Sequence, residues 1–290
     1  MRVQTFSIVA GTTACNACCP YCISKMTPRQ GVLQRIPEIN WRNFVKACQL
    51  AKTSAVTTIL ITGKGEPTLY PKQITGFLQK LEKFEFPLIE LQTNGIVFGK
   101  NWPAYKNHLK KWHALGLSTI SLSIVHYSAE KNQQIFTPGS KYFDLAEVIK
   151  KLHKIGFSVR LSCTLINGFI NSAEKVSELI KFSKSLEVEQ LSIRKLSRPL
   201  NPEVIEVFEW TKKHELPKAK LDEIISFLDA KGHRLMTLPH GGVIFDIDGQ
   251  NICITDALTI RPDTDNLRQI IFFPDGHLRF DWQFKGAVLL

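Results

Sequence analysis

The 290-residue sequence lacks a long apolar run and an apolar N-terminal segment. No stretch of about 18 or more uncharged apolar residues appears, so we expect no membrane span and no membrane partner. Residues 1–6 (MRVQTF) do not have the apolar core of a signal peptide. We therefore expect a cytoplasmic protein. In that reducing compartment a tight group of cysteines binds a metal or takes part in catalysis more often than it forms disulfides.

Cysteine is scarce outside one segment, since four of the seven cysteines lie within residues 15–22 (CNACCPYC). Cys15, Cys19 and Cys22 form a C-x3-C-x2-C pattern, with Cys18 as an extra thiol. The sequence has no second CxxC or HxxxH pair downstream, which a zinc site usually needs. Three thiolates on one loop suit an iron–sulfur cluster in which one iron has no protein ligand. Such an open position is typical of a site that binds another molecule.

Negative charge is outnumbered by positive charge before residue 240. The net charge is +11, and residues 240–290 carry four Lys/Arg against seven Asp, so the first 239 residues carry about +14. A basic body suits anionic partners such as a phosphorylated substrate, nucleic acid or an acidic electron carrier. Lysines that only solvate helix faces explain the same excess.

The body of the chain alternates strand and helix patterns. Strands are predicted at 4–10, 56–62, 88–92 and 190–196, and helices at 40–52, 71–83, 172–185, 202–213 and 218–231. Strand–helix alternation indicates a parallel sheet with helices outside it. On the strand near 160, Arg160, Ser162 and Thr164 share one face and are expected inside the sheet. Cys163 on the other face and Cys48 in a helix are expected in the core.

An internal repeat supports this organisation. Residues 109–123 (LKKWHALGLSTISLS) and 149–163 (IKKLHKIGFSVRLSC) align without gaps at an offset of 40. Each is a helix end, a glycine and a strand, as a βα barrel requires, although an open doubly wound sheet has similar units. His113 and His153 occupy equivalent places and are interpreted as helix-surface residues.

The last fifty residues change character. Asp248-Gly249 and Pro274-Asp275-Gly276 are turn sequences between β-rich segments. No low-complexity linker precedes them. We therefore predict two domains, a βα barrel over 1–238 and a β extension over 239–290 that packs on the barrel and covers its opening.

These motifs together resemble the radical S-adenosylmethionine (SAM) superfamily of the CxxxCxxC type. The resemblance includes the cysteine loop after the first strand, GKGEP (63–67) after the second and QTNG (92–95) after the third. It continues with Ser121-Leu-Ser123 on the fourth strand and RLSCTLING (160–168) on the fifth. The layout is similar to molybdenum-cofactor-type and peptide-modifying members without an auxiliary cluster. One departure is Lys64, which stands where the family has paired glycines.

The resemblance implies a fold, two cofactors and a reaction. The fold is a partial (β/α)6 TIM-like barrel, here with a small C-terminal β-hairpin extension. The cofactors are a [4Fe-4S] cluster and SAM. A reduced cluster would cleave SAM to a 5′-deoxyadenosyl radical that takes hydrogen from a small-molecule, nucleotide or peptide substrate. The electron would come from an acidic donor such as flavodoxin or ferredoxin.

The resemblance also implies site residues. The cluster ligands are Cys15, Cys19 and Cys22, and Cys18 is dispensable. Residues expected near SAM are Tyr21, Gly63, Gly65, Glu66, Asn94, Ser123, Ser162 and Arg194. Arg194, Lys195 and Arg198 could clamp the SAM carboxylate or a substrate anion, or each polar residue could be satisfied by a neighbour. Cys253 is a candidate hydrogen donor to a substrate radical, although a structural role is favoured.

Two other functions remain open from the sequence. One is an activator of a glycyl-radical enzyme, and the other is a non-catalytic iron–sulfur protein for binding or electron transfer. The intact SAM-segment motifs favour a radical SAM enzyme with its own substrate.

Overall fold

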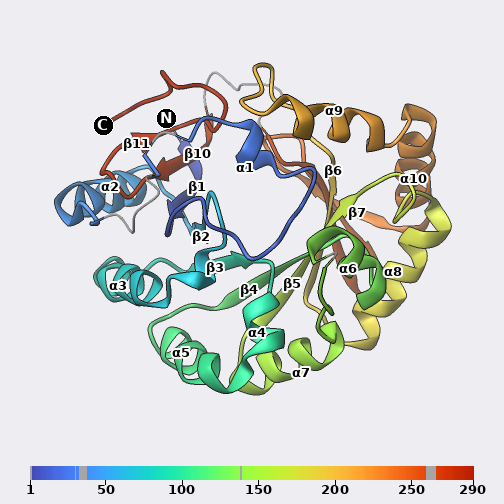
Figure 1. Ribbon diagram of the computed structural model, residues 1–290, viewed down its shortest axis with the longest axis horizontal. Helices are drawn as coiled ribbons and strands as arrows, with labels where there is room; N and C mark the ends of the chain where they lie inside the picture. The colour runs from blue at the N-terminus through green and yellow to red at the C-terminus, as the bar shows by residue number, and fades with distance from the viewer. Residues whose placement is uncertain (1, 30, 33–37, 138, 259–265) are drawn as a thin grey trace.

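The computed structural model describes residues 2–29, 31–32, 38–137, 139–258 and 266–290. These residues form one 11-stranded sheet in the order β11-β10-β1-β2-β3-β4-β5-β6-β9-β8-β7. The sheet curves, and helices such as α2, α3, α5, α7 and α8 surround its outer face (Figure 1). The strands are β1 (Arg2–Val9), β2 (Thr58–Thr62), β3 (Leu88–Thr93), β4 (Thr119–Ile124), β5 (Ser158–Leu165), β6 (Gln190–Lys195), β7 (His233–Thr237), β8 (Val243–Ile247), β9 (Gln250–Asp256), β10 (Asn266–Phe272) and β11 (Leu278–Arg279).

The helices follow the strands along the chain, as the alternation predicted. They are α1 (Ile23–Met26), α2 (Trp41–Thr53), α3 (Pro71–Leu81), α4 (Ile96–Lys100), α5 (Trp102–Ala114), α6 (Ala129–Phe136), α7 (Leu145–Ile155), α8 (Ala173–Ser185), α9 (Ile205–His214) and α10 (Lys218–Lys231), with short 3-10 turns η1 (Pro67–Leu69) and η2 (Glu82–Phe84). The sequence missed α1, α4, α6 and β7. The three helices have no more than eight residues, too few for a clear helical period.

Capping residues explain where the longer helices begin. The side chains of Asn40, Asp144 and Ser172 accept hydrogen bonds from the first turns of α2, α7 and α8. Gly156 ends α7 with a φ of 111°, a left-handed conformation that favours glycine.

The internal repeat forms two adjacent helix–strand units, α5–β4 and α7–β5. His113 is exposed and its Nε2 lies 3.2 Å from the Gly156 carbonyl oxygen, whereas His153 contacts Glu189 at 3.3 Å. Each histidine therefore joins its unit to the next one from the outside. The interpretation of both as helix-surface residues is confirmed.

Apolar side chains fill the layer between the sheet and the outer helices. Phe44 of α2 packs against Phe272 of β10, with ring centroids 5.1 Å apart, and Trp112 of α5 is fully buried. Cys48 and Cys163 are buried in the same core, as predicted. The helices are thus held to the sheet by burial of apolar surface.

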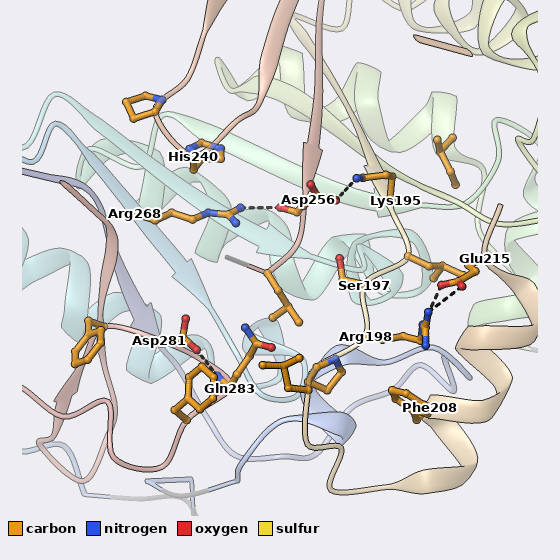
Figure 2. Close-up of a pocket in the computed structure, with 18 of the residues that line it drawn as sticks. Lys195, Ser197, Arg198, Phe208, Glu215, His240, Asp256, Arg268, Asp281 and Gln283 are labelled. Carbon is orange, nitrogen blue, oxygen red and sulfur yellow. Dashed lines mark hydrogen bonds and ion pairs between the residues drawn. The ribbon is translucent and has the colours of Figure 1, made fainter. Parts of the chain in front are cut away.

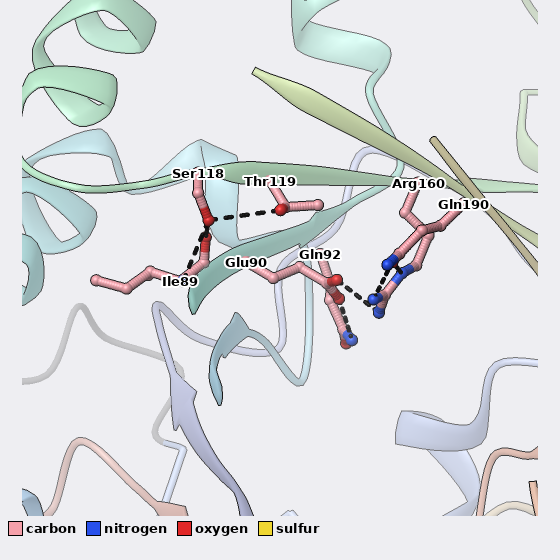
Figure 3. Close-up of polar contacts among 7 residues, drawn as sticks. All are labelled: Ile89, Glu90, Gln92, Ser118, Thr119, Arg160 and Gln190. Atoms are coloured by element: carbon pink, nitrogen blue, oxygen red, sulfur yellow. Dashed lines mark hydrogen bonds and ion pairs between the residues drawn. The ribbon is translucent and has the colours of Figure 1, made fainter. Parts of the chain in front are cut away.

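The inner face of the sheet is polar. Arg160 of β5 pairs with Glu90 of β3 at 2.6 Å and donates to the Gln190 side chain of β6 (Figure 3). Gln92 donates to the second oxygen of Glu90 at 3.0 Å. This network lies inside the barrel and gives each of these polar side chains a hydrogen-bond or ion-pair partner on the same or another strand. The predicted inward face of β5 is confirmed at Arg160.

The C-terminal strands extend the sheet at both of its edges. Every neighbouring pair from β10 through β1 to β6 and β9 is parallel. The next strand at each end is antiparallel to its neighbour, because a tight turn connects the two. The Asp248-Gly249 turn joins β8 to β9, and the turn at 274–276 joins β10 to β11. Both predicted turns are confirmed. The extension thus adds strands to the barrel sheet, and β7, which precedes residue 238, pairs with β8. The division into domains at 238 stays a prediction.

The described sheet does not close into a complete barrel, since β9 and β10 are not hydrogen-bonded neighbours. Side chains bridge this lateral opening instead. Arg268 of β10 donates to the Asp256 carbonyl oxygen of β9 at 2.7 Å, and His240 Nδ1 donates to Gln4 Oε1 of β1 at 2.8 Å. The partial barrel predicted from the sequence is confirmed, with its opening between these two strands.

Candidate active site

The cysteine loop follows β1 at the carboxyl end of the sheet. Burial raises the pKa of Cys15 to about 11, and the nearby Glu66 carboxylate and Cys22 thiol raise it further. Burial also raises the pKa of Cys19, and the thiols of Cys22 and Cys15 add to that effect. These three thiols therefore lie near enough to interact electrostatically. Cys18 is exposed, and its backbone N–H donates to the Phe136 carbonyl oxygen at 2.9 Å.

The donor set of this loop fits an iron–sulfur cluster better than a single metal ion. Within the described ranges, no group of three or more His, Cys, Asp or Glu side chains is arranged to hold one ion. Cluster thiolates do not have to converge on one point, because each can bind a different iron. Three neighbouring thiols that are not crowded around one position match that requirement.

The GKGEP segment packs directly against the cysteine loop. The Glu66 backbone N–H donates to the Ala14 carbonyl oxygen at 2.9 Å. A Cβ on Gly65 would lie 2.0 Å from that same oxygen, and one on Gly63 would lie 2.9 Å from the Gly65 oxygen. Gly65 therefore has to be glycine for the loop to approach so closely. The two motifs are one structural unit.

The buried side chain of Glu66 connects this unit to the end of β3. Its Oε1 accepts from Thr68 N at 3.0 Å, Thr68 Oγ1 at 2.5 Å and Thr93 Oγ1 at 2.6 Å. Its Oε2 accepts from Asn94 N at 2.9 Å. Burial raises the pKa of the Glu66 carboxyl, although these hydrogen bonds act in the opposite direction. The carboxylate is held by donors from the η1 turn and from the end of β3.

Asn94 carries the connection back to the cysteine loop. Its Nδ2 donates to Asn16 Oδ1 at 2.7 Å and lies 3.8 Å from the Cys15 sulfur. Its Oδ1 accepts from the backbone N–H of Ile96, at the start of α4. Sequence analysis did not single out Asn16 or Thr68. Thr68 follows Glu66 by two residues, the distance at which a helix cap accepts a backbone N–H.

Lys64 points away from the glycines beside it. Its side chain is buried, and Nζ donates to Thr27 Oγ1 at 2.6 Å and lies 5.2 Å from the Trp282 ring centroid. Burial lowers the pKa of Lys64 to about 8, while the Cys22 thiol acts to raise it. The residue that departs from the family pattern thus joins the GKGEP segment to two other parts of the chain.

Tyr21 lies between the cysteine loop and the far side of the barrel. Its hydroxyl is hydrogen-bonded to Thr164 of β5, and its ring lies 6.2 Å from the ring of Trp210 on α9. Burial raises the pKa of this hydroxyl, and Cys19 raises it further. The position is consistent with the predicted shielding of the cluster, which stays a prediction.

The serines predicted from the strands form one row inside the barrel. Ser123 of β4 is level with Ser162 of β5, Ser162 with Ser192 of β6, and Ser192 with Cys253 of β9. In-register partners of parallel strands face the same side of a sheet. Cys253 therefore lies on the same face and level as the serines expected near SAM.

A cavity of about 1100 Å³ occupies the lateral opening (Figure 2). Lys195 is ion-paired with Asp256 at 2.9 Å, and Arg198 with Glu215 through two contacts at 3.0 Å. The anion clamp predicted at Lys195 and Arg198 is therefore already matched by carboxylates. Apolar residues form much of the remaining wall, including Leu165, Leu196, Leu216, Leu221, Phe280 and Phe284.

Residues 9–183 match the family model described as the radical SAM superfamily. The chain belongs to this superfamily, as the resemblance of its motifs indicated. Membership implies a [4Fe-4S] cluster and SAM as cofactors.

One curated relative is the GTP 3′,8-cyclase of Aquifex aeolicus (strain VF5). It is 29% identical over 183 residues, which are 61% of this chain and 52% of the relative. The chain thus spans about half the length of that enzyme.

Two solved structures share the fold. SuiB of Streptococcus suis bound to S-adenosylmethionine matches with a TM-score of 0.63 and 13% identity, over 96% of this chain and 60% of SuiB. Methylornithine synthase (PylB) matches with a TM-score of 0.54 and 14% identity, over 91% and 74% of the two chains. These matches confirm the partial barrel.

No described helix is long and apolar enough to cross a membrane.

Proposed function

We propose that this enzyme holds its cluster through Cys15, Cys19 and Cys22 and binds SAM beside it on the GKGEP segment. When bound, these cofactors supply a 5′-deoxyadenosyl radical that removes hydrogen from a substrate of the enzyme's own. The observation that carries the proposal is the direct contact between Gly65 and Ala14. It brings the thiol loop and the SAM segment together without any intervening side chain.

Glu66 and Asn94 have complementary roles in this proposal. Within the described residues, Glu66 Oε2 accepts one hydrogen bond, from Asn94 N, so it can accept another from the SAM ammonium. The carbonyl groups of Gly63 and Gly65 are the other expected acceptors. Asn94 orients Glu66 and the cysteine loop at the same time.

Ser123 and Ser162 face the barrel interior one strand apart, where hydroxyls can bind the ribose or the carboxylate of SAM. Tyr21 covers the cluster on the side of α9. Cys253, level with the serine row, stays a proposed hydrogen donor.

The segment 239–290 covers the lateral opening in this proposal. Arg268, Phe280, Asp281 and Phe284 from this segment line the cavity. A wall there would limit the access of water to radical intermediates.

An acidic one-electron donor such as flavodoxin or ferredoxin would dock near the cysteine loop. Lys25 and Arg29, which follow Cys22, are exposed and basic. The large cavity favours an enzyme with its own substrate over an activator of a glycyl-radical enzyme, whose substrate is a protein segment, and over a non-catalytic iron–sulfur protein.

The test is SAM cleavage by anaerobically reconstituted protein. We expect reduction with dithionite in the presence of SAM to give 5′-deoxyadenosine, measured by liquid chromatography. A triple Cys15→Ala, Cys19→Ala, Cys22→Ala variant provides the background rate. Protein with a full complement of iron and sulfide that forms no more 5′-deoxyadenosine than this variant would contradict the proposal.

A further inference from the structure

Two buried hydrogen-bonding atoms on neighbouring strands have no partner within the described residues. They are Arg194 Nε on β6 and Thr255 Oγ1 on β9. The two residues are level with each other in the parallel register, so their side chains leave the sheet on the same face. Buried polar atoms in native proteins are nearly always hydrogen-bonded. Two unsatisfied neighbours therefore indicate a missing acceptor.

The face in question is the barrel interior. Arg160, whose side chain crosses the interior to Glu90, precedes Thr164 by four residues on β5, and Thr164 is level with Arg194. The opposite face of β6 carries Leu191 and Ile193, both fully buried in the core. Arg194 and Thr255 therefore point into the barrel.

Positive charge is in excess at this point. Arg160 is paired with Glu90, Lys195 with Asp256 and Arg198 with Glu215. Arg194 and Arg268 make no ion pair in the described part of the chain, and Arg268 donates only to a carbonyl oxygen. Burial is the main cause that lowers the pKa of each, and each is close enough to Arg160 or Arg194 for repulsion to add to it.

The nearby acidic and titratable groups among the described residues do not cancel this excess. Glu90 acts on Arg194 electrostatically but is already ion-paired with Arg160. Asp281 and Asp256 act on Arg268 electrostatically, but Asp281 Oδ1 accepts from the Gln283 backbone at 2.6 Å, and Asp256 pairs with Lys195. Burial, with Arg268 and Arg194 adding to it, lowers the pKa of His240 to about 4. His240 is therefore neutral near pH 7. The guanidinium groups of Arg194 and Arg268, both half-buried, have no ion-pair partner among the described residues. Desolvated charge of this kind is costly unless a ligand supplies the anion.

We propose that Arg194, Thr255 and Arg268 bind a carboxylate or phosphate group of the substrate beside the cavity, which is lined by Arg268 and by Lys195 and Asp256, the chain neighbours of Arg194 and Thr255. The inference rests on the proposed function for the reaction itself. Two of the three residues come from β9 and β10, which flank the opening, and Arg268 lines the cavity (Figure 2). Arg194 was also expected near SAM from the sequence, and this proposal assigns it to the substrate instead. The other residues expected around SAM lie on the loops and strands from β1 to β5.

The site also fixes where the rest of the substrate lies. Cys253 precedes Thr255 by two residues on β9, so its side chain also faces the barrel interior, beside Ser192 of β6. Burial raises the pKa of its thiol, and Arg160, Arg194 and Arg268 act in the opposite direction. A substrate held by its oxyanion at Arg194 and Thr255 extends toward the row of Cys253, Ser192 and Ser162. Ser162 in that row is one of the two serines whose hydroxyls are proposed to bind SAM.

The experiment measures binding of inorganic phosphate to the reconstituted protein by calorimetry, at constant ionic strength in sodium chloride. The variants are Arg268→Gln and Thr255→Val, and the control is Lys213→Gln, which removes an exposed lysine of α9. Loss of a charge-assisted hydrogen bond is worth about tenfold or more in affinity. We expect Arg268→Gln to weaken phosphate binding by about that factor, Thr255→Val by about threefold, and Lys213→Gln to leave it unchanged.

Thermal unfolding separates a binding role of Thr255 from a structural one. Because its hydroxyl is buried without a partner, Thr255→Val should raise the unfolding temperature in chloride while it weakens phosphate binding. Lower stability together with unchanged phosphate affinity would overturn the assignment. So would equal loss of affinity in Lys213→Gln, or no phosphate binding by the unaltered protein.

A SAM titration separates the two possible sources of the oxyanion. We expect saturating SAM to leave phosphate affinity unchanged. If SAM displaces phosphate, the site binds the SAM carboxylate and the substrate assignment is wrong. Phosphate binding by protein that forms no 5′-deoxyadenosine would refute the proposed reaction and leave the oxyanion site standing. The reverse result would refute the site alone.

Discussion

Two polar regions of the barrel differ in whether their groups are satisfied. At the carboxyl ends of β1 to β3, the Glu66 carboxylate accepts hydrogen bonds from four donors of the described chain. Inside β6, β9 and β10, Arg194 Nε and Thr255 Oγ1 have no described partner. Within the described residues, the first region is assembled without a ligand, and the second has two buried polar atoms that lack a partner.

The contrast has a physical reason. A buried carboxylate that is hydrogen-bonded by the protein keeps its neighbours in place before any cofactor arrives, and the interior's low dielectric strengthens those bonds. A buried cation without a partner favours an incoming anion for the same reason. We therefore expect changes around the cysteine loop and Glu66 to damage structure and cofactor binding together. Changes around Arg268 and Thr255 should act mainly on ligand binding.

The largest expected effect is on the cluster. Cys19→Ala removes one of the three interacting thiols and should abolish the brown absorption after reconstitution. Cys18→Ala should keep it, because Cys18 is exposed and is tied to α6 only through its backbone. Iron and sulfide content and the visible spectrum are the measurements. A cluster that needs Cys18 and survives without Cys19 would show that the ligand assignment is wrong.

A smaller effect is expected at Glu66, where the assembled region is altered without loss of a thiol. Glu66→Gln places an amide nitrogen opposite the Asn94 backbone N–H, since the oxygen is needed for the donors from Thr68 and Thr93. Leaving a buried donor unsatisfied costs about 1–3 kcal/mol in the free energy of unfolding. SAM affinity should fall by roughly tenfold or more, because a charged partner of its ammonium is lost.

The exposed Glu82 provides the control, as Glu82→Gln makes the same chemical change on the surface. Urea unfolding and equilibrium SAM binding are compared for the two variants. Normal stability together with normal SAM affinity in Glu66→Gln would remove this carboxylate from both roles.

The smallest expected effect is a pH dependence from Lys64. Burial lowers the pKa of Lys64 from the ordinary 10.5 to about 8 in the folded, cluster-free protein. Between these values the unfolded chain holds a proton that the folded chain has lost, so this lysine makes the free energy of unfolding rise with pH. The limit for one group is about 1.4 kcal/mol per pH unit.

Urea unfolding of the unaltered protein and of Lys64→Met from pH 7 to pH 10 measures this effect. The charged neighbours Cys22, Arg279, Glu203 and Arg29 are present in both proteins, so the difference between them isolates Lys64. Lys25→Met, at an exposed lysine close by, is the matched control. We expect the unaltered protein to gain stability relative to Lys64→Met as the pH rises above 8. If the difference in their free energies of unfolding stays constant there, burial does not lower the pKa of Lys64.

Much of the barrel and of its cysteine site could be predicted from local patterns. The strands β1 to β6, the repeat and the two glycine-containing turns each depend on residues close together in the chain. The spacing of Cys15, Cys19 and Cys22 and the order of the motifs identified the family. The roles of individual SAM residues stay predictions, because they depend on a molecule that no local pattern specifies.

The sequence by itself determined most of the strands and the longer helices, because hydrophobic period and capping act over a few residues. Only the tertiary structure decided that β9 and β10 join the edges beside β6 and β1, since pairing of distant strands depends on how the whole sheet curves. The same holds for Lys64 reaching Trp282 and for Arg194 beside Thr255. Those contacts join residues far apart in the chain, and only folding brings them together.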